Sequence, residues 1–186
     1  MNFKQKNNLL FRLTFPIAVG LLTMAITPHA HGQVEVEVDP IAYALNGYSG
    51  HIAYGFDPLR ISLGGFGADQ PEFFHGNEGW EARSRGITMK VDYLLPKLGG
   101  YFVGLDATYS WNDYTLKSTN ETQSQNALGL GVRTGYRFTF KKTGFYMVPW
   151  FSVSYPFNTE EVVISGEKFE SSRVLVFPTI HLGWQF

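Results

Sequence analysis

The last fifteen residues of the chain, 172–186, alternate large apolar side chains with small or polar ones. Successive side chains of a β-strand point to opposite faces, so this alternation predicts a strand with one apolar and one polar face. The chain stops on Trp184 and Phe186, and aromatic rings at a frayed end in water would gain nothing from burial. The pattern favours a strand whose apolar face meets lipid. That face carries Val174, Val176, Pro178, Ile180, Leu182, Trp184 and Phe186.

The same period of two recurs along the chain after residue 32, where no stretch keeps the apolar period of a helix. Besides the C-terminal strand, the predicted strands are 45–56, 59–68, 84–95, 101–116, 126–140 and 145–156. The last of these contains Pro149, which has no N–H to donate, so we expect a bulge or a break there. Bacterial single-chain membrane barrels have an even number of strands, so the alternating segment Val34–Val38 is expected to be the eighth strand.

Connections of two lengths separate these strands. The short ones are Asp57–Pro58, 96–100 and 141–144, and the long polar ones are 69–83, 117–125 and 158–171. Membrane barrels have tight periplasmic turns and extended extracellular loops, so the short connections are expected on the periplasmic side. Within the third long connection, Ser165–Gly166 predicts the turn of an extra hairpin beyond the membrane.

The N-terminus has the pattern of a secretory signal. Lys4, Lys6 and Arg12 flank or precede an apolar run over 13–26, which is shorter than the about 20 residues of a spanning helix. Ala30 and Gly32 have the spacing preferred for cleavage, so we expect a signal peptide over 1–32 and a mature domain over 33–186. An uncleaved anchor helix is the alternative. Without Cys, the chain has neither a lipid-anchoring cysteine nor disulfides.

The charge of the mature chain limits the class of partner. Removing residues 1–32 takes away three of the 15 Lys and Arg residues, which leaves 12 against 16 Asp and Glu. A net charge of about −4 argues against a nucleic-acid partner, which would require a basic face.

The signal segment, the amphipathic strands, the two kinds of connection and the terminal aromatic residue together resemble the small eight-stranded outer-membrane proteins of the OmpX, OmpW and OmpA-barrel type. The resemblance implies an all-β, closed antiparallel transmembrane β-barrel in the bacterial outer membrane, without a cofactor. It also implies contact with outer-membrane lipid and recognition by the barrel-assembly machinery through Ile180, Leu182, Trp184 and Phe186. A soluble lipid-binding barrel is the structural alternative, and it would point its apolar side chains inward.

The polar faces of the strands predict a charged interior. The expected inward-facing residues are His51, Lys90, Asp92, Asp106, Arg133, Arg137, Arg173 and His181. Eight strands enclose a bore that side chains can fill, so we expect ion pairs and hydrogen bonds there. A narrow path for ions or small solutes is the alternative.

The loop over 69–83 is the most unusual connection, and it combines acidic side chains with the candidate interaction residues Phe73, Phe74, His75 and Trp80. The leading expectation is a structural or surface-binding role through the extracellular loops, with an extracellular ligand or protein as a further partner. Asp69, Glu72, His75 and Glu78 could offer oxygen and nitrogen ligands, but their spacing matches no metal motif, so no metal is predicted.

Some small outer-membrane barrels are lipid-modifying enzymes or proteases, and catalysis of that kind would require a histidine beside a nucleophile and a carboxylate. His75, Ser84 and Glu72 are the weak catalytic candidates. Because no catalytic motif surrounds them, the sequence predicts a protein that is not an enzyme.

Overall fold

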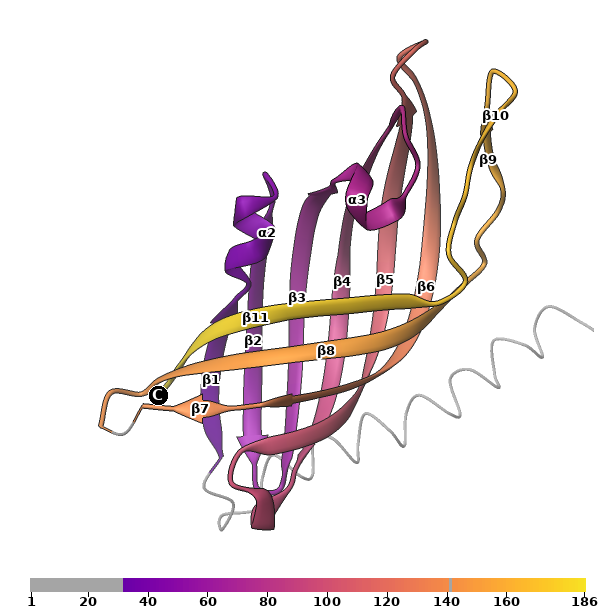
Figure 1. Ribbon diagram of the computed structural model, residues 1–186. Helices are drawn as coiled ribbons and strands as arrows, with labels where there is room; N and C mark the ends of the chain where they lie inside the picture. The colour runs from indigo at the N-terminus through magenta and orange to yellow at the C-terminus, as the bar shows by residue number, and fades with distance from the viewer. Residues whose placement is uncertain (1–31, 141) are drawn as a thin grey trace, which may run out of the picture. The chain divides into compact units, whose positions relative to one another are not determined.

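The computed structural model describes residues 32–140 and 142–186, and within them eight strands form a closed antiparallel ring (Figure 1). In chain order the ring consists of β1 (Gln33–Val38), β2 (Tyr48–Phe56), β3 (Leu59–Gln70), β4 (Trp80–Leu94), β5 (Tyr101–Leu116), β6 (Glu121–Tyr136), β8 (Phe145–Phe157) and β11 (Leu175–Gln185). Neighbouring strands pair, and β11 pairs with both β8 and β1. The predicted barrel is confirmed. The predicted signal peptide lies outside the described residues, apart from Gly32, and stays a prediction.

Short elements fill the connections. They are α2 (Pro40–Ala44), α3 (Glu72–His75), the 3-10 turn η1 (Pro96–Leu98), β7 (Phe138–Thr139), β9 (Val162–Ile164) and β10 (Glu167–Phe169). The helices of the described residues are all too short to cross a bilayer. The turn between β9 and β10 is Ser165–Gly166, as predicted, and positive φ angles of 50° and 82° suit the twist of a tight hairpin.

Pro149 interrupts the ladder at the predicted place. β6 pairs with β8 as far as Gly135 opposite Trp150, and β7 resumes with Phe138 opposite Met147. The two pairings have the same register, so the interruption is a break and not a bulge. It falls opposite Pro149 and Val148, where the proline supplies no N–H.

Most side chains that face away from the ring are apolar, and most that face into it are polar. The interior also contains a first hydrophobic core, which consists of Phe102, Tyr146, Val148 and Trp150. Ile52, Leu63 and Leu105 point outward and are 62–66 % exposed, whereas Lys90 and Asp92 are 3 % and 2 % exposed. A soluble lipid-binding barrel would have the opposite arrangement, so the structural alternative is wrong.

The predicted long loop over 117–125 is also wrong. Only residues 117–120 form a turn, and β6 begins at Glu121, so that β5 and β6 pair over their whole lengths. The outer part of β6 carries polar side chains on both faces, which hides the period of a strand. Cross-strand contacts hold it in place, such as that between the hydroxyls of Thr115 and Thr122 at 2.8 Å.

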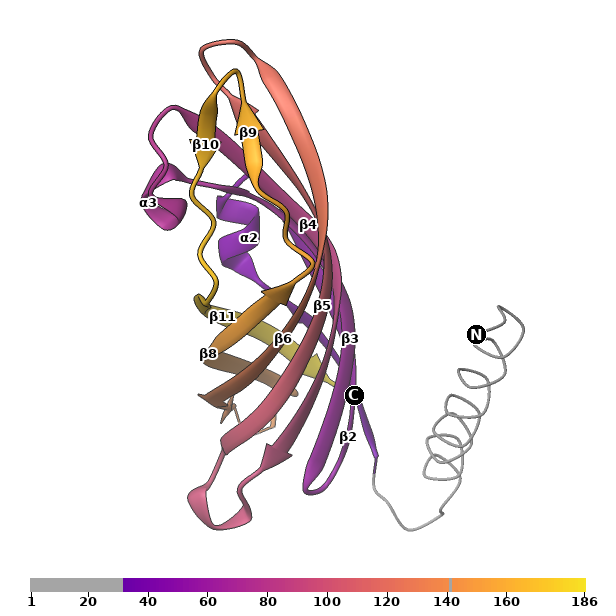
Figure 2. The same ribbon diagram turned by 90° about the vertical axis from the view of Figure 1, so that its right-hand side faces the viewer.

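The wall of the ring is uneven in height. β4, β5 and β6 continue beyond the other strands at the end that carries α3, β9 and β10 (Figure 2). We call this the long-loop end, and we call the end with the β2–β3, β4–β5 and β7–β8 turns the short-turn end.

Candidate functional site

A buried arginine joins three strands in the barrel interior. Because Val34, Val36 and Val38 face outward on β1, Glu35 and Glu37 face inward. Arg60 on β3 donates to Glu35 Oε2 from Nε at 2.7 Å and to Glu37 Oε1 from Nη2 at 2.6 Å. Its Nη1 lies 3.2 Å from Asp92 Oδ2 on β4. All four side chains are at most 6 % exposed, so this is a desolvated cluster of one cation and three carboxylates.

The cluster continues toward the short-turn end. Arg137 Nη1 lies 2.6 Å from Glu35 Oε1, and the Tyr146 hydroxyl donates to Glu35 Oε2 at 2.9 Å. The Arg137 guanidinium also lies 3.8 Å from the centre of the Tyr146 ring, a cation–π contact. Glu35 is therefore contacted by residues of β3, of β8 and of the connection between β6 and β7.

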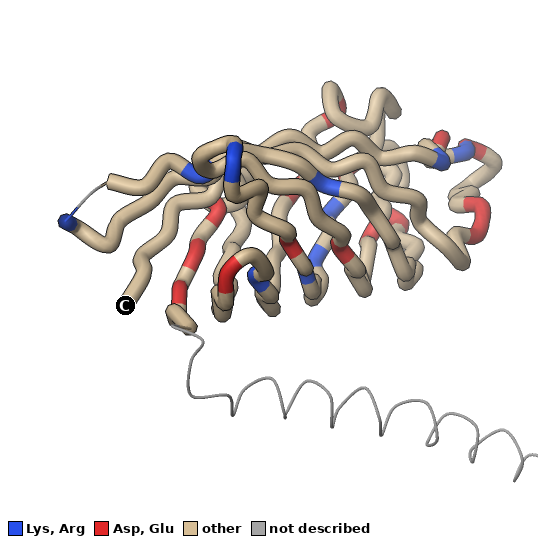
Figure 3. Tube along the Cα trace, turned by 90° about the horizontal axis from the view of Figure 1, so that it is seen from below, with Lys and Arg blue, Asp and Glu red and all other residues tan. Residues whose placement is uncertain are grey.

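The opposite side of the cluster contains histidines, a lysine and a tryptophan. His181 on β11 lies 2.9 Å from Glu37, between Nδ1 and Oε2, and its ring centre is 5.0 Å from that of His51. Lys90 Nζ and the Arg133 guanidinium lie 5.0 Å and 4.1 Å from the ring centre of Trp150. Positive groups of two strands therefore stack on one indole inside the barrel. Figure 3, seen from the short-turn end, shows acidic and basic positions on neighbouring strands of the ring.

Asp39 connects the interior to α2 at the long-loop end. Its carboxylate accepts from the Ile41 amide at 2.8 Å, which caps the helix, and from the Thr179 hydroxyl at 2.7 Å. The Asp39 amide donates to the Ser49 hydroxyl oxygen at 3.2 Å. These contacts fix α2 to β2 and β11.

The structure places seven of the eight predicted interior residues inside the ring. The exception is Arg173, which is exposed and precedes β11, so its assignment to the interior is corrected. The alternation predicted a strand over 172–186, but pairing with β8 begins only at Leu175.

Sequence reasoning missed the centre of the cluster, which consists of Glu35, Glu37 and Arg60. A signal was present, because Val and Glu alternate along β1, and the valines could only be the lipid-facing set. On β3, Arg60 likewise faces inward, because it lies between the outward residues Leu59 and Ile61.

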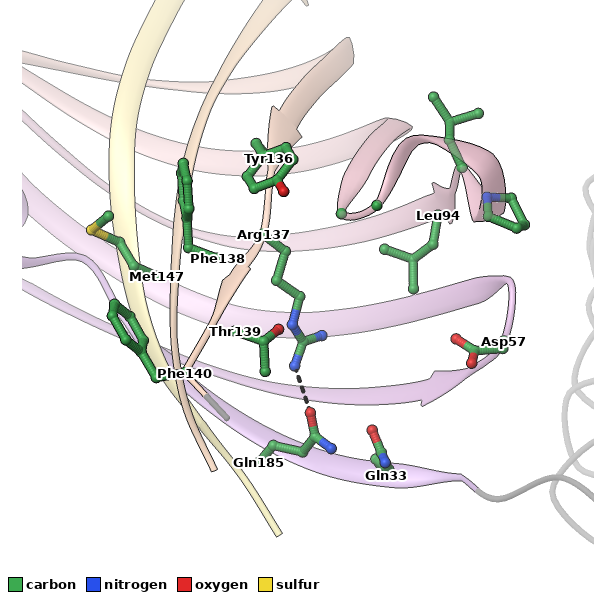
Figure 4. A pocket seen from close by; sticks show the side chains of 14 residues that line it. Gln33, Asp57, Leu94, Tyr136, Arg137, Phe138, Thr139, Phe140, Met147 and Gln185 are labelled. Atoms are coloured by element: carbon green, nitrogen blue, oxygen red, sulfur yellow. Dashed lines mark hydrogen bonds between the residues drawn. The ribbon is translucent and has the colours of Figure 1, made fainter. Parts of the chain in front are cut away.

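An opening of about 570 Å³ lies at the short-turn end (Figure 4). Arg137 points across it and donates from Nη2 to Gln185 Oε1 at 2.9 Å. Beyond Arg137 lie Glu35, Arg60 and Tyr146, each at most 5 % exposed. Large buried side chains thus fill the bore behind the opening, as expected for eight strands.

The long-loop end has a second hydrophobic core. The β9–β10 hairpin packs Val162, Ile164 and Phe169 against inward-facing side chains on the extended parts of β4 and β5. The latter are Trp80, Ala82, Tyr114 and Leu116. The loops at this end therefore form a packed layer.

Polar contacts tie the second core to its neighbours. The Asn77 side chain pairs with both backbone groups of Glu170, at 2.7 Å and 3.1 Å. On the other side, Gln123 Oε1 accepts from the Val163 amide at 3.2 Å, and Gln125 Oε1 accepts from the Glu160 amide at 3.0 Å. Side chains of β6 thereby satisfy the backbone of the hairpin.

The four candidate interaction residues fall into different environments. Phe73 and Phe74 on α3 are 80 % and 51 % exposed, and their rings lie 4.7 Å apart. Trp80 is only 3 % exposed and belongs to the second core, so it cannot be a loop contact and this assignment is corrected. His75 packs on Phe169 and accepts from the Asn77 amide at 3.1 Å.

The weak catalytic candidates do not form a triad in the described part of the chain. Ser84 donates to Asn112 Oδ1 at 2.5 Å, and Glu72 Oε1 lies 2.9 Å from Lys117 Nζ. The hydrogen bond from Lys117 lowers the pKa of Glu72, and burial lowers the pKa of His75. Among residues 32–140 and 142–186, no three His, Asp or Glu side chains are grouped to hold a metal ion.

The fold and the exposure pattern define the class: the chain has the fold of a small outer-membrane β-barrel. No protein-family model matches the sequence, and no curated protein is significantly similar to it. Among solved structures, Neisserial surface protein A (NspA) is 14 % identical, with 83 % of this chain and 96 % of that chain covered and a TM-score of 0.49. The N-terminal β-barrel domain of Pseudomonas aeruginosa OprF is 14 % identical, with 83 % and 97 % covered and a TM-score of 0.45.

A third solved structure, a major outer membrane protein from Thermus thermophilus, is 16 % identical, with 83 % and 99 % covered and a TM-score of 0.48. The assignment of the fold rests on the closed ring and the outward apolar side chains of this chain.

Proposed function

We propose that this chain is an integral protein of the bacterial outer membrane, in which a closed barrel anchors a rigid binding surface on the cell exterior. The placement in lipid follows from the outward side chains of β5, which are apolar from Tyr101 to Trp111. Ten residue steps correspond to about 34 Å along a strand. A strand tilt of about 40° reduces this to roughly 26 Å, close to the height of the apolar band of such barrels.

Aromatic rings at both edges of this band favour the same placement. Tyr101 and Tyr136 pair at the short-turn end with ring centres 4.7 Å apart, and Tyr109 and Trp111 pair toward the long-loop end at 5.0 Å. Tyr and Trp prefer membrane interfaces because the ring is buried while its polar group stays hydrated. Arg85, opposite Trp111, begins the charged part of β4 beyond the band.

The second hydrophobic core is the observation that best supports the proposed binding role. A loop that only connects strands needs no core, whereas a binding surface benefits from rigid loops because less entropy is lost on binding. The β9–β10 hairpin is therefore proposed to present a pre-formed surface to an extracellular ligand or protein.

Single cysteines test the placement, because the chain has none of its own. A membrane-impermeant maleimide should label Ser118→Cys in intact cells, since residue 118 lies in the β5–β6 turn. Lys97→Cys, in the η1 turn, should react only after the outer membrane is permeabilised. Labelling of Lys97→Cys in intact cells would contradict the orientation.

The binding role is tested by disrupting the second hydrophobic core with a substitution outside the strands of the ring. Val162 is fully buried in that core, so Val162→Asp should loosen the hairpin, and the exposed neighbour change Val163→Asp is the matched control. We expect weaker adhesion of cells carrying Val162→Asp to protein-coated surfaces than of cells carrying the control. Equal adhesion of both strains and of a strain without the protein would refute the binding role.

Conductance measurements in planar bilayers distinguish the binding role from the role of a narrow channel. The packed interior predicts no steady conductance for the wild type. Conductance that disappears when Arg133 and Arg137 are replaced would favour the channel instead.

Recognition by the barrel-assembly machinery is proposed for Ile180, Leu182, Trp184 and Phe186, and truncation of Phe186 should lower the yield of folded barrel.

A further inference from the structure

The exposed aromatic pair on α3 has no role in either hydrophobic core. Phe73 is 80 % exposed and stacks on Phe74, whereas the neighbouring His75 and Glu72 side chains accept hydrogen bonds from the Asn77 and Gly79 amides. In Figure 2, α3 lies farther out than β8 and β11 on the same side of the ring. The helix α3 therefore overhangs this side of the ring.

The wall below α3 ends early. β1 pairs with β11 only from Leu182 to Gln185, so residues 175–181 of β11 have no β1 partner. In Figure 1, α2 and α3 lie above β11 and β8. An apolar groove of about 550 Å³ lies between them. Its lining includes Ile41 on α2, Phe74 on α3 and the outward residues Pro149, Phe151, Pro178 and Ile180.

The chemistry of the groove fits a hydrocarbon. The side-chain hydroxyls along it belong to Thr134 and Thr179, and both already donate, to the Phe102 carbonyl and to Asp39 Oδ2, each at 2.7 Å. Among the described residues, those that line the groove carry no charge, and its outward residues on β8 and β11 are apolar. A headgroup or a polar peptide would lose hydrogen bonds to water there without replacing them.

We propose that this groove holds an acyl chain of a lipid in the leaflet at the long-loop end, with Phe73 and Phe74 immersed in the same leaflet. This inference rests on the proposed membrane placement. It makes α3 a lipid contact and leaves the β9–β10 hairpin as the part of the surface that faces water.

Photolabelling tests the proposal on the full mature chain. The protein is placed in phosphatidylcholine vesicles that contain a phospholipid with a diazirine at mid-chain, irradiated and digested, and the labelled peptides are identified by mass spectrometry. The wild type should be labelled at residues 72–80 as well as on the apolar band of β5. Phe73→Asp/Phe74→Asp should reduce labelling of 72–80 by at least about tenfold, since carboxylates are expelled from hydrocarbon. Phe73→Leu/Phe74→Leu is the matched control and should keep the label.

The outcomes separate this inference from the membrane placement. If the wild type is labelled on β5 but not on α3, the proposal that the groove holds an acyl chain is refuted. Phe73 and Phe74 would then be exposed to water and available to a soluble partner. An unlabelled β5 would overturn the proposed membrane barrel itself. Heat-modifiable gel mobility shows whether the aspartate variant folds. If it does not fold, labelling of residues 72–80 in the wild type and in the leucine control still tests the proposal.

Discussion

Replacing Arg60 tests whether the buried cluster stabilises the barrel. Arg60→Met keeps most of the side-chain volume but leaves Glu35, Glu37 and Asp92 without their shared cation, in surroundings where each is at most 3 % exposed. Loss of one partner of a buried ion pair costs about 3–5 kcal/mol. At about 1.4 kcal/mol per factor of ten, this raises the unfolded fraction by roughly two to three and a half orders of magnitude.

Urea unfolding of the protein in detergent micelles, followed by gel mobility, measures this change. Arg83→Met is the matched control, because Arg83 lies 3.5 Å from Asp69 with both side chains about half exposed. Such a surface pair contributes about 0–1 kcal/mol. Adding Glu37→Gln to Arg60→Met should recover part of the loss, since it removes one of the three carboxylates that shared the Arg60 cation. A loss in Arg60→Met no larger than in the control would refute the reasoning.

Two further perturbations follow from the structure. Gly183→Ala places a Cβ against the ring of the fully buried Tyr146, so we expect a loss of about 1–3 kcal/mol in the same unfolding assay. Gly50→Ala is its control because a Cβ there meets nothing within 4 Å, and equal stability of the two variants would contradict the packing. Acidification should loosen α3. The pKa of Glu72 and the pKa of His75 are both lowered, so the docked loop is stabilised above their ordinary values of 4.5 and 6.5 and loses that stability as the pH falls below them. Hydrogen exchange of residues 72–79 measures this loosening, and unchanged protection between pH 7 and pH 4 would refute it.

Residue spacing was enough to assign the faces of the strands. Outward and inward side chains alternate along each strand regardless of what the strand pairs with, so a closed barrel with a polar interior could be predicted from residue spacing alone. The break at Pro149 and the turn at Ser165–Gly166 are local for the same reason, since a missing N–H and positive φ angles depend on the residues themselves.

Which inward residues contact one another depends on how distant strands pair. Glu35, Arg60 and Asp92 are far apart in the chain, and only the pairing register and tilt of β1, β3 and β4 bring them together. Likewise, Trp80 is buried because the β9–β10 hairpin, more than 80 residues later, folds onto it. Local alternation gives a side chain its face but not its height in the barrel or its neighbour, because these depend on contacts between distant strands.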